Sequence, residues 1–201
     1  MIRLYLVTDR RLVPDLPSAL QAALSALPPG SAAVQLREKD LPAARLLEVA
    51  RRLLPICRAT SAPLIVNDRV DVARAAKADG VQLPSRGLPV AQARELLGPD
   101  RLIGASCHAA DEVAAAHRSG ADFALFGPVW DTPGKTARGI AALKEAVRAS
   151  PLPVLAIGGV TAETARLAIE AGAAGVACIR SVLGAPDPAA AARDLYLAMT
   201  G

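Results

Sequence analysis

The sequence predicts a (β/α)8 TIM barrel, and three of its features support this fold class. Eight apolar runs of strand length each end in glycine or polar residues, and stretches with helical spacing separate most of them. Strands that alternate with helices form a parallel sheet. Similar sequences also lead into several of the runs, at 78–81, 120–123 and 172–176. Repetition of one supersecondary unit favours a closed barrel over a doubly wound open sheet.

The elements follow one another along the chain as this fold requires. The predicted strands are residues 4–8, 33–37, 63–67, 80–83, 102–106, 123–127, 154–157 and 175–179. Helical spacing of Ala, Leu and Arg predicts helices over 43–57, 90–97 and 111–119, another that begins near Val70, and a last one over 189–199 that can close the barrel. Between the last two strands, Thr161 is the expected N-cap of a helix and Gly172 its expected left-handed C-cap glycine.

Composition bears on both the architecture and the partners. Because 52% of the residues are apolar and no low-complexity linker divides them, we expect one domain over residues 1–201. The net charge is +4, but the basic residues are scattered and only 2% of residues are aromatic. An anionic small molecule is therefore a better partner than nucleic acid. The basic pairs Arg10-Arg11 and Arg51-Arg52 are interpreted as solvated positions.

Cysteine usage and the lack of long apolar runs bear on the compartment. Three widely spaced cysteines, an odd number without metal-ligand spacing, indicate free thiols in a reducing environment. No apolar run approaches the length of a membrane span, and no signal segment precedes the first strand. We therefore expect a cytoplasmic protein without a membrane partner, and we leave open whether it forms a homo-oligomer.

The last two predicted strands end in groups that suit an anion. Gly158 and Gly159 follow the seventh strand, and Ile179-Arg180 end the eighth. In a (β/α)8 barrel these two loops commonly form a phosphate site, here from backbone N–H groups and a guanidinium. The alternative is an ordinary βαβ unit whose glycines serve only its turns.

The second predicted strand carries polar side chains where a buried parallel strand should be apolar. A period of two places Gln35, Arg37 and Lys39 on one face, toward the mouth of the barrel. An amide and two cations there predict recognition of a polar, anionic ligand. The alternative is a structural ion-pair network with Glu38, Asp40 or an acid of a neighbouring strand.

The third predicted strand ends in Asn67-Asp68, directly before a helix. Asp68 is the candidate metal ligand, because Mg²⁺ beside a substrate phosphate typically takes only one or two protein carboxylates. Asn and Asp are equally good helix N-caps, and capping is the alternative role for this pair.

The candidate catalytic residues lie after the fifth and sixth predicted strands. Ser106 and His108 share a face at the end of the fifth, and histidine is a common general acid/base. The alternative for His108 is a helix-capping or surface role. The stretch 126–136 lacks a regular period, and its Thr132 and Lys135 lie among prolines and glycines. Such a stretch is typical of a lid that folds over a phosphorylated ligand.

These segments match a known family in order and spacing, so that the chain resembles the thiamine phosphate synthase/TenI family from end to end. The matching segments are LYLVTDR, VQLREKD, VNDRVDVA, ADGVQL, GASCH, GPVWDTPGK, AIGGVT and AGAAGVACIRSV. The resemblance implies a (β/α)8 barrel that handles the thiazole phosphate of thiamin biosynthesis and, in the synthase, also the pyrimidine diphosphate. It further implies that Gln35, Arg37, Lys39, Asn67 and Asp68 match positions that bind this diphosphate and its Mg²⁺.

Three departures from the synthase pattern fall on the phosphate and metal positions. Gly87 replaces a second Mg²⁺ aspartate, Gly134 replaces the second threonine of a Thr-x-Thr-Lys motif, and Arg180 replaces a serine after the eighth strand. The Pro-Ser-x-x loop and the Ile-Arg-Ser-Val ending resemble the TenI branch, whose characterised activity is tautomerisation of the thiazole carboxylate phosphate. The histidine of that tautomerase follows the sixth strand, where this chain has Gly127-Pro128, so either His108 transfers the proton or the activity differs.

We therefore expect a TenI-like thiazole tautomerase that works by general acid/base catalysis and needs no cofactor. The first alternative is thiamine phosphate synthase itself, a transferase that couples hydroxymethylpyrimidine diphosphate with thiazole phosphate and uses Mg²⁺. The second is a non-catalytic barrel that binds the thiazole or thiamine phosphate and works through a partner protein. Metal need separates the first two, because only the synthase must stabilise a departing pyrophosphate.

Overall fold

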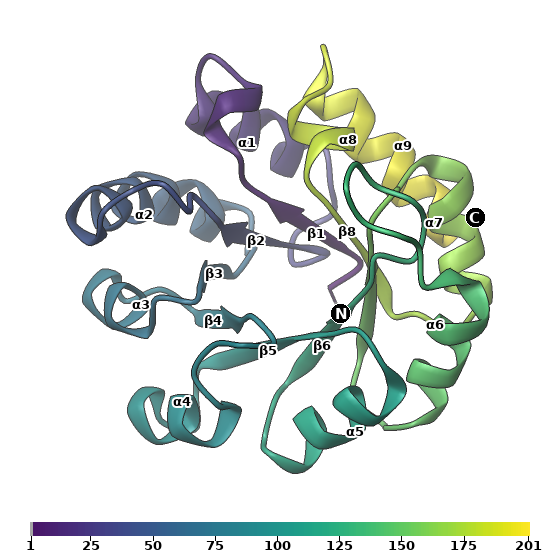
Figure 1. Ribbon diagram of the computed structural model, residues 1–201. Helices are drawn as coiled ribbons and strands as arrows, with labels where there is room; N and C mark the ends of the chain where they lie inside the picture. Colours follow the sequence, from purple (N-terminus) through teal and green to yellow (C-terminus); the bar gives the residue numbers. More distant parts are fainter. Residues whose placement is uncertain (1) are drawn as a thin grey trace.

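The eight apolar runs form eight parallel strands that close into a barrel in chain order, in a computed structural model that describes residues 2–201 (Figure 1). The strands are β1 (Leu4–Val7), β2 (Ala32–Leu36), β3 (Leu64–Asn67), β4 (Gly80–Leu83), β5 (Leu102–Cys107), β6 (Phe123–Phe126), β7 (Val154–Ile157) and β8 (Gly175–Cys178). β1 pairs with β8, where Leu4 lies beside Val176, and this pairing closes the ring. The predicted (β/α)8 TIM barrel is therefore confirmed and the open sheet is excluded.

Helices follow the strands and surround the barrel (Figure 1). They are α1 (Leu16–Ser25), α2 (Ala43–Ala59), α3 (Val70–Ala76), α4 (Val90–Leu97), α5 (Ala110–Arg118), α6 (Gly139–Arg148), α7 (Ala162–Glu170), α8 (Arg180–Leu183) and α9 (Pro188–Thr200), with a 3₁₀ helix η1 (Arg10–Leu12) after β1. α9 packs against both α1 and α7, so the last helix joins the two ends of the outer ring. Within residues 2–201, no helix combines the length and the apolar character that crossing a membrane requires.

The caps of α7 show how local sequence sets an element. Thr161 is the N-cap, as predicted: its Oγ1 accepts from the N–H of Thr164 at 3.2 Å, and the Thr164 Oγ1 accepts from the N–H of Thr161 at 2.7 Å. This reciprocal capping box satisfies two N–H groups that a helix start leaves unpaired. Gly172 follows the helix with a φ of 95°, the left-handed conformation expected of a C-cap glycine.

Alternation along the strands produces two apolar cores. One fills the inside of the barrel, where Tyr5 and Phe123 meet edge to face with ring centroids 5.6 Å apart. The other lies between the strands and the helices and includes Leu4, Leu6 and Val34. The period of two places a polar side chain inward near the carboxyl end of each of β2 to β5, whereas the inward residues there in β1, β6, β7 and β8 are apolar. The polar ones are Gln35, Asn67, Gln82 and Ser106, and they form the floor of the barrel mouth.

Candidate functional site

A hydrogen-bonded chain of buried polar groups forms this floor. The Tyr5 hydroxyl donates to Oε1 of Gln82 at 3.5 Å, and Nε2 of Gln82 donates to the Ser106 hydroxyl oxygen at 3.0 Å. Burial raises the pKa of Tyr5, so that its phenol stays protonated and remains a donor. Ser106 is therefore held in place at the mouth. Sequence reasoning missed Gln82, although its inward phase in β4 is the same signal that identified Gln35.

Three cations from two loops gather at the β2 side of the mouth. Arg37 and Lys39 follow β2, and Lys135 comes from the loop after β6. The positive charge of Arg37, then burial, then the charge of Lys135 lower the pKa of Lys39, while Asp68 opposes this effect. Among residues 2–201, none of the three cations makes an ion pair. The cluster therefore carries a surplus of positive charge that suits a polyanion.

The acids beside these cations in the sequence are paired elsewhere. Glu38 and Asp40 both form ion pairs with Arg10 of η1, with N–O distances of 3.1 and 2.6 Å. The alternative that Arg37 and Lys39 belong to an ion-pair network with Glu38 or Asp40 is therefore wrong. The Arg10 side chain is 35% exposed, so it is partly solvated as expected, but its guanidinium also contacts both carboxylates, which was not expected from the sequence.

Asp68 lies exposed after β3 with a left-handed φ of 64°, and its N–H donates to the Gln82 carbonyl at 2.9 Å. Arg69 is the N-cap of α3, so the capping alternative for Asn67 and Asp68 is wrong. A Cβ on Gly87 would lie 3.0 Å from Oδ1 of Asp68, which places the loop after β4 directly against this carboxylate. Gly87 adds no second acid there.

Asp68 is the one carboxylate at this part of the mouth that could ligate Mg²⁺ among the predicted site residues. Within the described part of the chain, no three His, Cys, Asp or Glu side chains gather as a metal site. Mg²⁺ usually keeps several waters and binds one or two carboxylates together with substrate phosphates. Asp68 therefore fits a Mg²⁺ that a phosphorylated substrate also ligates, and does not fit a metal held by protein groups alone.

The loops after β7 and β8 present backbone N–H groups and one arginine, rather than a cluster of charged side chains. Gly158 and Gly159 have φ values of 101° and 63°, and the Ser181 hydroxyl donates to the Val160 carbonyl at 2.6 Å, which ties the two loops together. Arg180 begins α8 and is exposed, while Ile179 packs on the inner core. Gly158, Gly159, Ile179 and Arg180 thus lie at the ends of adjacent strands, as predicted.

The loop between β6 and α6 is shaped by a tight turn. Thr132 and Lys135 form a backbone bridge, in which the N–H of Lys135 donates to the Thr132 carbonyl at 3.0 Å. Figure 1 shows this loop beside α7 and α8. A Cβ on Gly158 would lie 2.5 Å from Cβ of Pro128, so the start of the loop packs directly on the glycines after β7. That close approach is a second reason for glycine, beyond the turn.

His108 fastens β5 to β6. Its Nδ1 lies 2.5 Å from the Gly127 carbonyl, and its backbone N–H donates to Glu112 at 2.6 Å. Because a carbonyl oxygen only accepts, Nδ1 carries a proton, so the neutral form of the ring has its lone pair on Nε2. Ala109 is the N-cap of α5, so the ring of His108 does not cap this helix. Nε2 remains able to accept a proton, which leaves the acid/base role a prediction.

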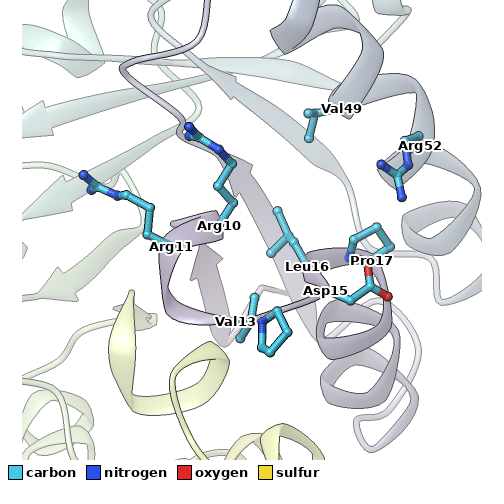
Figure 2. Close-up of a pocket in the computed structure, with 9 residues that line it drawn as sticks. Arg10, Arg11, Val13, Asp15, Leu16, Pro17, Val49 and Arg52 are labelled. Atoms are coloured by element: carbon cyan, nitrogen blue, oxygen red, sulfur yellow. The ribbon is translucent and has the colours of Figure 1, made fainter.

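Two cavities lie on the flanks of the barrel and contain none of the predicted site residues. One, of about 340 Å³, lies between η1, α1 and α2, and two of its three arginines, Arg10 and Arg11, are already paired with acids, while the third is Arg52 (Figure 2). The other, of about 410 Å³, lies between the ends of α3 and α4. The convergent polar groups at the mouth therefore define the candidate site better than cavity shape does.

Fold and site together define a (β/α)8 barrel whose mouth suits phosphorylated small molecules. A match to the family described as thiamine monophosphate synthase spans residues 4–182, and the chain belongs to this family. It is 48% identical over 198 residues to a putative thiamine-phosphate synthase of Geobacter sulfurreducens, covering 96% of this chain and 92% of the relative. A thiamine-phosphate synthase of Roseiflexus castenholzii is 43% identical over 195 residues, covering 95% and 85% of the two chains.

A solved structure agrees with these sequence matches. The thiamine phosphate pyrophosphorylase of Pyrococcus furiosus superposes with a TM-score of 0.91 at 35% identity, covering 99% of this chain and 96% of that one. The predicted family is therefore confirmed over nearly the whole chain.

Proposed function

We propose that the protein is a thiamine-phosphate synthase, which joins a pyrimidine diphosphate to a thiazole phosphate. The names of its relatives favour this alternative over the TenI-like tautomerase expected from the sequence. The observation that carries the proposal is the cluster of Arg37, Lys39 and Lys135, which forms no ion pair within residues 2–201 and lies near Asp68. A diphosphate supplies the negative charge that this cluster lacks.

The two substrates would occupy different parts of the mouth. The diphosphate would lie at Arg37 and Lys39, with Gln35 and Asn67 as further donors. The thiazole phosphate would lie against the N–H groups of Gly158 and Gly159 and the guanidinium of Arg180. Loops after strands 7 and 8 are the common phosphate site of this fold. Ser106, which Gln82 holds, would bind the pyrimidine between the two.

The chain's cations would then act on the charge that develops during the reaction. The bond from the pyrimidine methylene carbon to oxygen breaks, the electron pair leaves on pyrophosphate, and the lone pair of the thiazole nitrogen forms the new C–N bond. Arg37, Lys39 and Lys135 would stabilise the departing anion. Asp68 would hold Mg²⁺, which would supply further neutralisation of the pyrophosphate. Thr132 would position the loop that brings Lys135 to the site.

The test is thiamine phosphate formation from both substrates, with a Mg²⁺ titration. We expect product only with both substrates, and we expect Asp68→Asn to raise the Mg²⁺ concentration needed for half-maximal rate by about tenfold, since roughly 1.4 kcal/mol of a carboxylate contact is lost. Asp71→Asn is the matched control, because Asp71 is exposed and pairs with Arg69. Binding of both substrates without product would support the non-catalytic barrel instead.

One observation keeps the tautomerase as a second candidate. Gly87 offers no second acid beside Asp68, and Nε2 of His108 is free to accept a proton. If the protein isomerises the thiazole carboxylate phosphate in the presence of EDTA and forms no thiamine phosphate, the tautomerase replaces the synthase. In that case His108→Gln should cut turnover by about 10² to 10⁴ while binding is kept.

A further inference from the structure

We propose that Arg10 is a positioning residue, which holds the carboxylates of Glu38 and Asp40 away from Arg37 and Lys39 and so keeps these two cations available for a diphosphate. The inference deepens the proposed function and rests on it for the identity of the substrate. It assigns a role to a side chain that lies outside the barrel mouth.

The contacts of the residues after β2 separate the charges. Glu38 and Asp40 both pair with Arg10, whereas Lys39 lies within reach of the charges of Arg37, Lys135 and Asp68. The four charged residues at 37–40 are consecutive, so each cation has an acid as its chain neighbour. An acid that turned toward the mouth would neutralise the cation that the diphosphate needs.

Glu38 is fixed by several hydrogen bonds in a buried place. Its side chain is only 2% exposed, and its Oε1 accepts from the Thr8 hydroxyl at 2.7 Å and from the Arg10 N–H at 3.0 Å. Its Oε2 accepts from Nη1 of Arg10 at 3.1 Å. Burying a carboxylate is costly unless it has partners of this kind, and the Arg10 guanidinium is the charged partner of Glu38.

Asp40 is held by the same guanidinium, whose Nη1 contacts both acids. Its Oδ1 and Oδ2 accept from Nη1 and Nη2 of Arg10 at 2.7 and 2.6 Å, a two-pronged contact that lysine cannot reproduce. Hydrogen bonds from Arg10 lower the pKa of Asp40 to about 2, so this side chain is charged at neutral pH. Without Arg10, an exposed carboxylate would stand one residue from Lys39.

Thr8 couples this arrangement to the backbone of Arg37. The Thr8 hydroxyl donates to Glu38 and also accepts from the N–H of Arg37 at 3.0 Å. Thr8 is fully buried. Figure 2 shows Arg10 extended from η1 away from Asp15 and Leu16, so it serves the strand ends rather than α1. The set Arg10, Thr8 and Glu38 therefore fixes the direction in which the residues after β2 leave the strand.

The experiment measures binding of inorganic pyrophosphate with Mg²⁺ by calorimetry, and steady-state kinetics with both substrates. Arg10→Gln should raise the Kd for pyrophosphate and the KM for the pyrimidine diphosphate by about tenfold, the size of one lost charge-assisted contact. It should leave kcat and the KM for thiazole phosphate within about twofold, because the site after β7 and β8 does not contact this network. Arg45→Gln is the matched control, an arginine paired with Glu48 on the exposed face of α2.

A second variant distinguishes two causes of weaker binding: the negative charge of a released Asp40, and a changed conformation of the residues after β2. Arg10→Gln combined with Asp40→Asn removes the exposed one of the two acids that Arg10 holds, and should recover most of the lost pyrophosphate affinity, because the buried Glu38 still accepts from Thr8. Unchanged pyrophosphate affinity in Arg10→Gln, an equal rise in KM for both substrates, or no recovery in the double variant would each overturn the inference. If Arg10→Gln does not fold, Arg10→Lys decides: it keeps the charge but loses the two-pronged contact, and should weaken pyrophosphate binding by roughly threefold.

The pyrophosphate binding measurement also tests the role of Arg10 separately from the proposed synthase activity. Pyrophosphate affinity needs no turnover, so a protein that makes no thiamine phosphate would still show a difference between Arg10→Gln and Arg45→Gln if Arg10 positions the cations.

Discussion

The two sides of the barrel mouth are built on different principles. The side after β1 and β2 depends on charged side chains: Arg37 and Lys39 make no ion pair within residues 2–201, while the neighbouring Glu38 and Asp40 pair with Arg10. The side after β7 and β8 depends on backbone, with Gly158 and Gly159 in left-handed conformations and Arg180 as its cation. The first side is therefore vulnerable to changes of charge, and the second to changes of shape.

The largest expected effect is that a substitution on each side of the mouth weakens the binding of one substrate and leaves the other unchanged. Arg37→Ala should lower kcat/KM for the pyrimidine diphosphate by about a hundredfold, since a guanidinium makes two charge-assisted hydrogen bonds worth about 1.5 kcal/mol each. Arg180→Ala should raise the Kd for thiazole phosphate by about tenfold. Kinetics with each substrate varied in turn checks both. Loss of both affinities in either variant would mean that the two sides are not separate sites.

A single added carbon should damage the β7–β8 side. In Gly158→Ala the new Cβ would lie 2.5 Å from Cβ of Pro128, and the residue would keep a φ of 101°. We expect a loss of about 2 to 4 kcal/mol in the free energy of unfolding, together with weaker thiazole phosphate binding. Gly120→Ala is the matched control, because Gly120, which follows α5, has a φ of 89° with no atom within 4 Å of the added Cβ. It should lose only about 1 kcal/mol, and equal losses in chemical denaturation would remove the packing argument.

The smallest expected effect is proton uptake on the charged side. The neighbouring cations lower the pKa of Lys39 in the free protein, chiefly through Arg37. A bound diphosphate reverses this repulsion and raises the pKa again, so pyrophosphate binding at about pH 9.5 should take up a fraction of a proton. Calorimetry in two buffers of different ionisation enthalpy measures it. Lys39→Met should abolish the uptake and Lys144→Met, on α6, should not, whereas proton release would contradict the assignment.

Much of the fold and the outline of the site could be predicted from the sequence. The period of the apolar residues located β7 and β4 to the residue and the other strands to within about one residue, because burial on both faces leaves a continuous apolar run. The rule that polar residues at the carboxyl ends of strands meet at the mouth then placed Arg37, Asp68 and Arg180 at one end of the barrel.

The partners of those residues could not be predicted in this way. Arg10 contacts Glu38 across 28 residues, and Asp68 lies beside Gly87 only because the loops after β3 and β4 meet. Such contacts follow from tertiary packing rather than from any local period. The same limit explains why the ion pairs of Arg10 were not expected, since the local sequence around an arginine near a strand end does not indicate which acids it will contact.

Closure of the ring also has a consequence for synthesis of the protein. Arg3 donates to the carbonyl of Ala174, 171 residues later, and β1 has its β8 partner only when that segment exists. At translation rates of about 5 to 20 residues per second, the free edge of β1 must wait roughly 10 to 30 seconds for β8 to leave the ribosome. An unpaired strand edge is a template for wrong association. The nascent chain is thus most exposed to aggregation just before β8 emerges, and a ribosome arrested at that point would carry an open sheet in need of a chaperone.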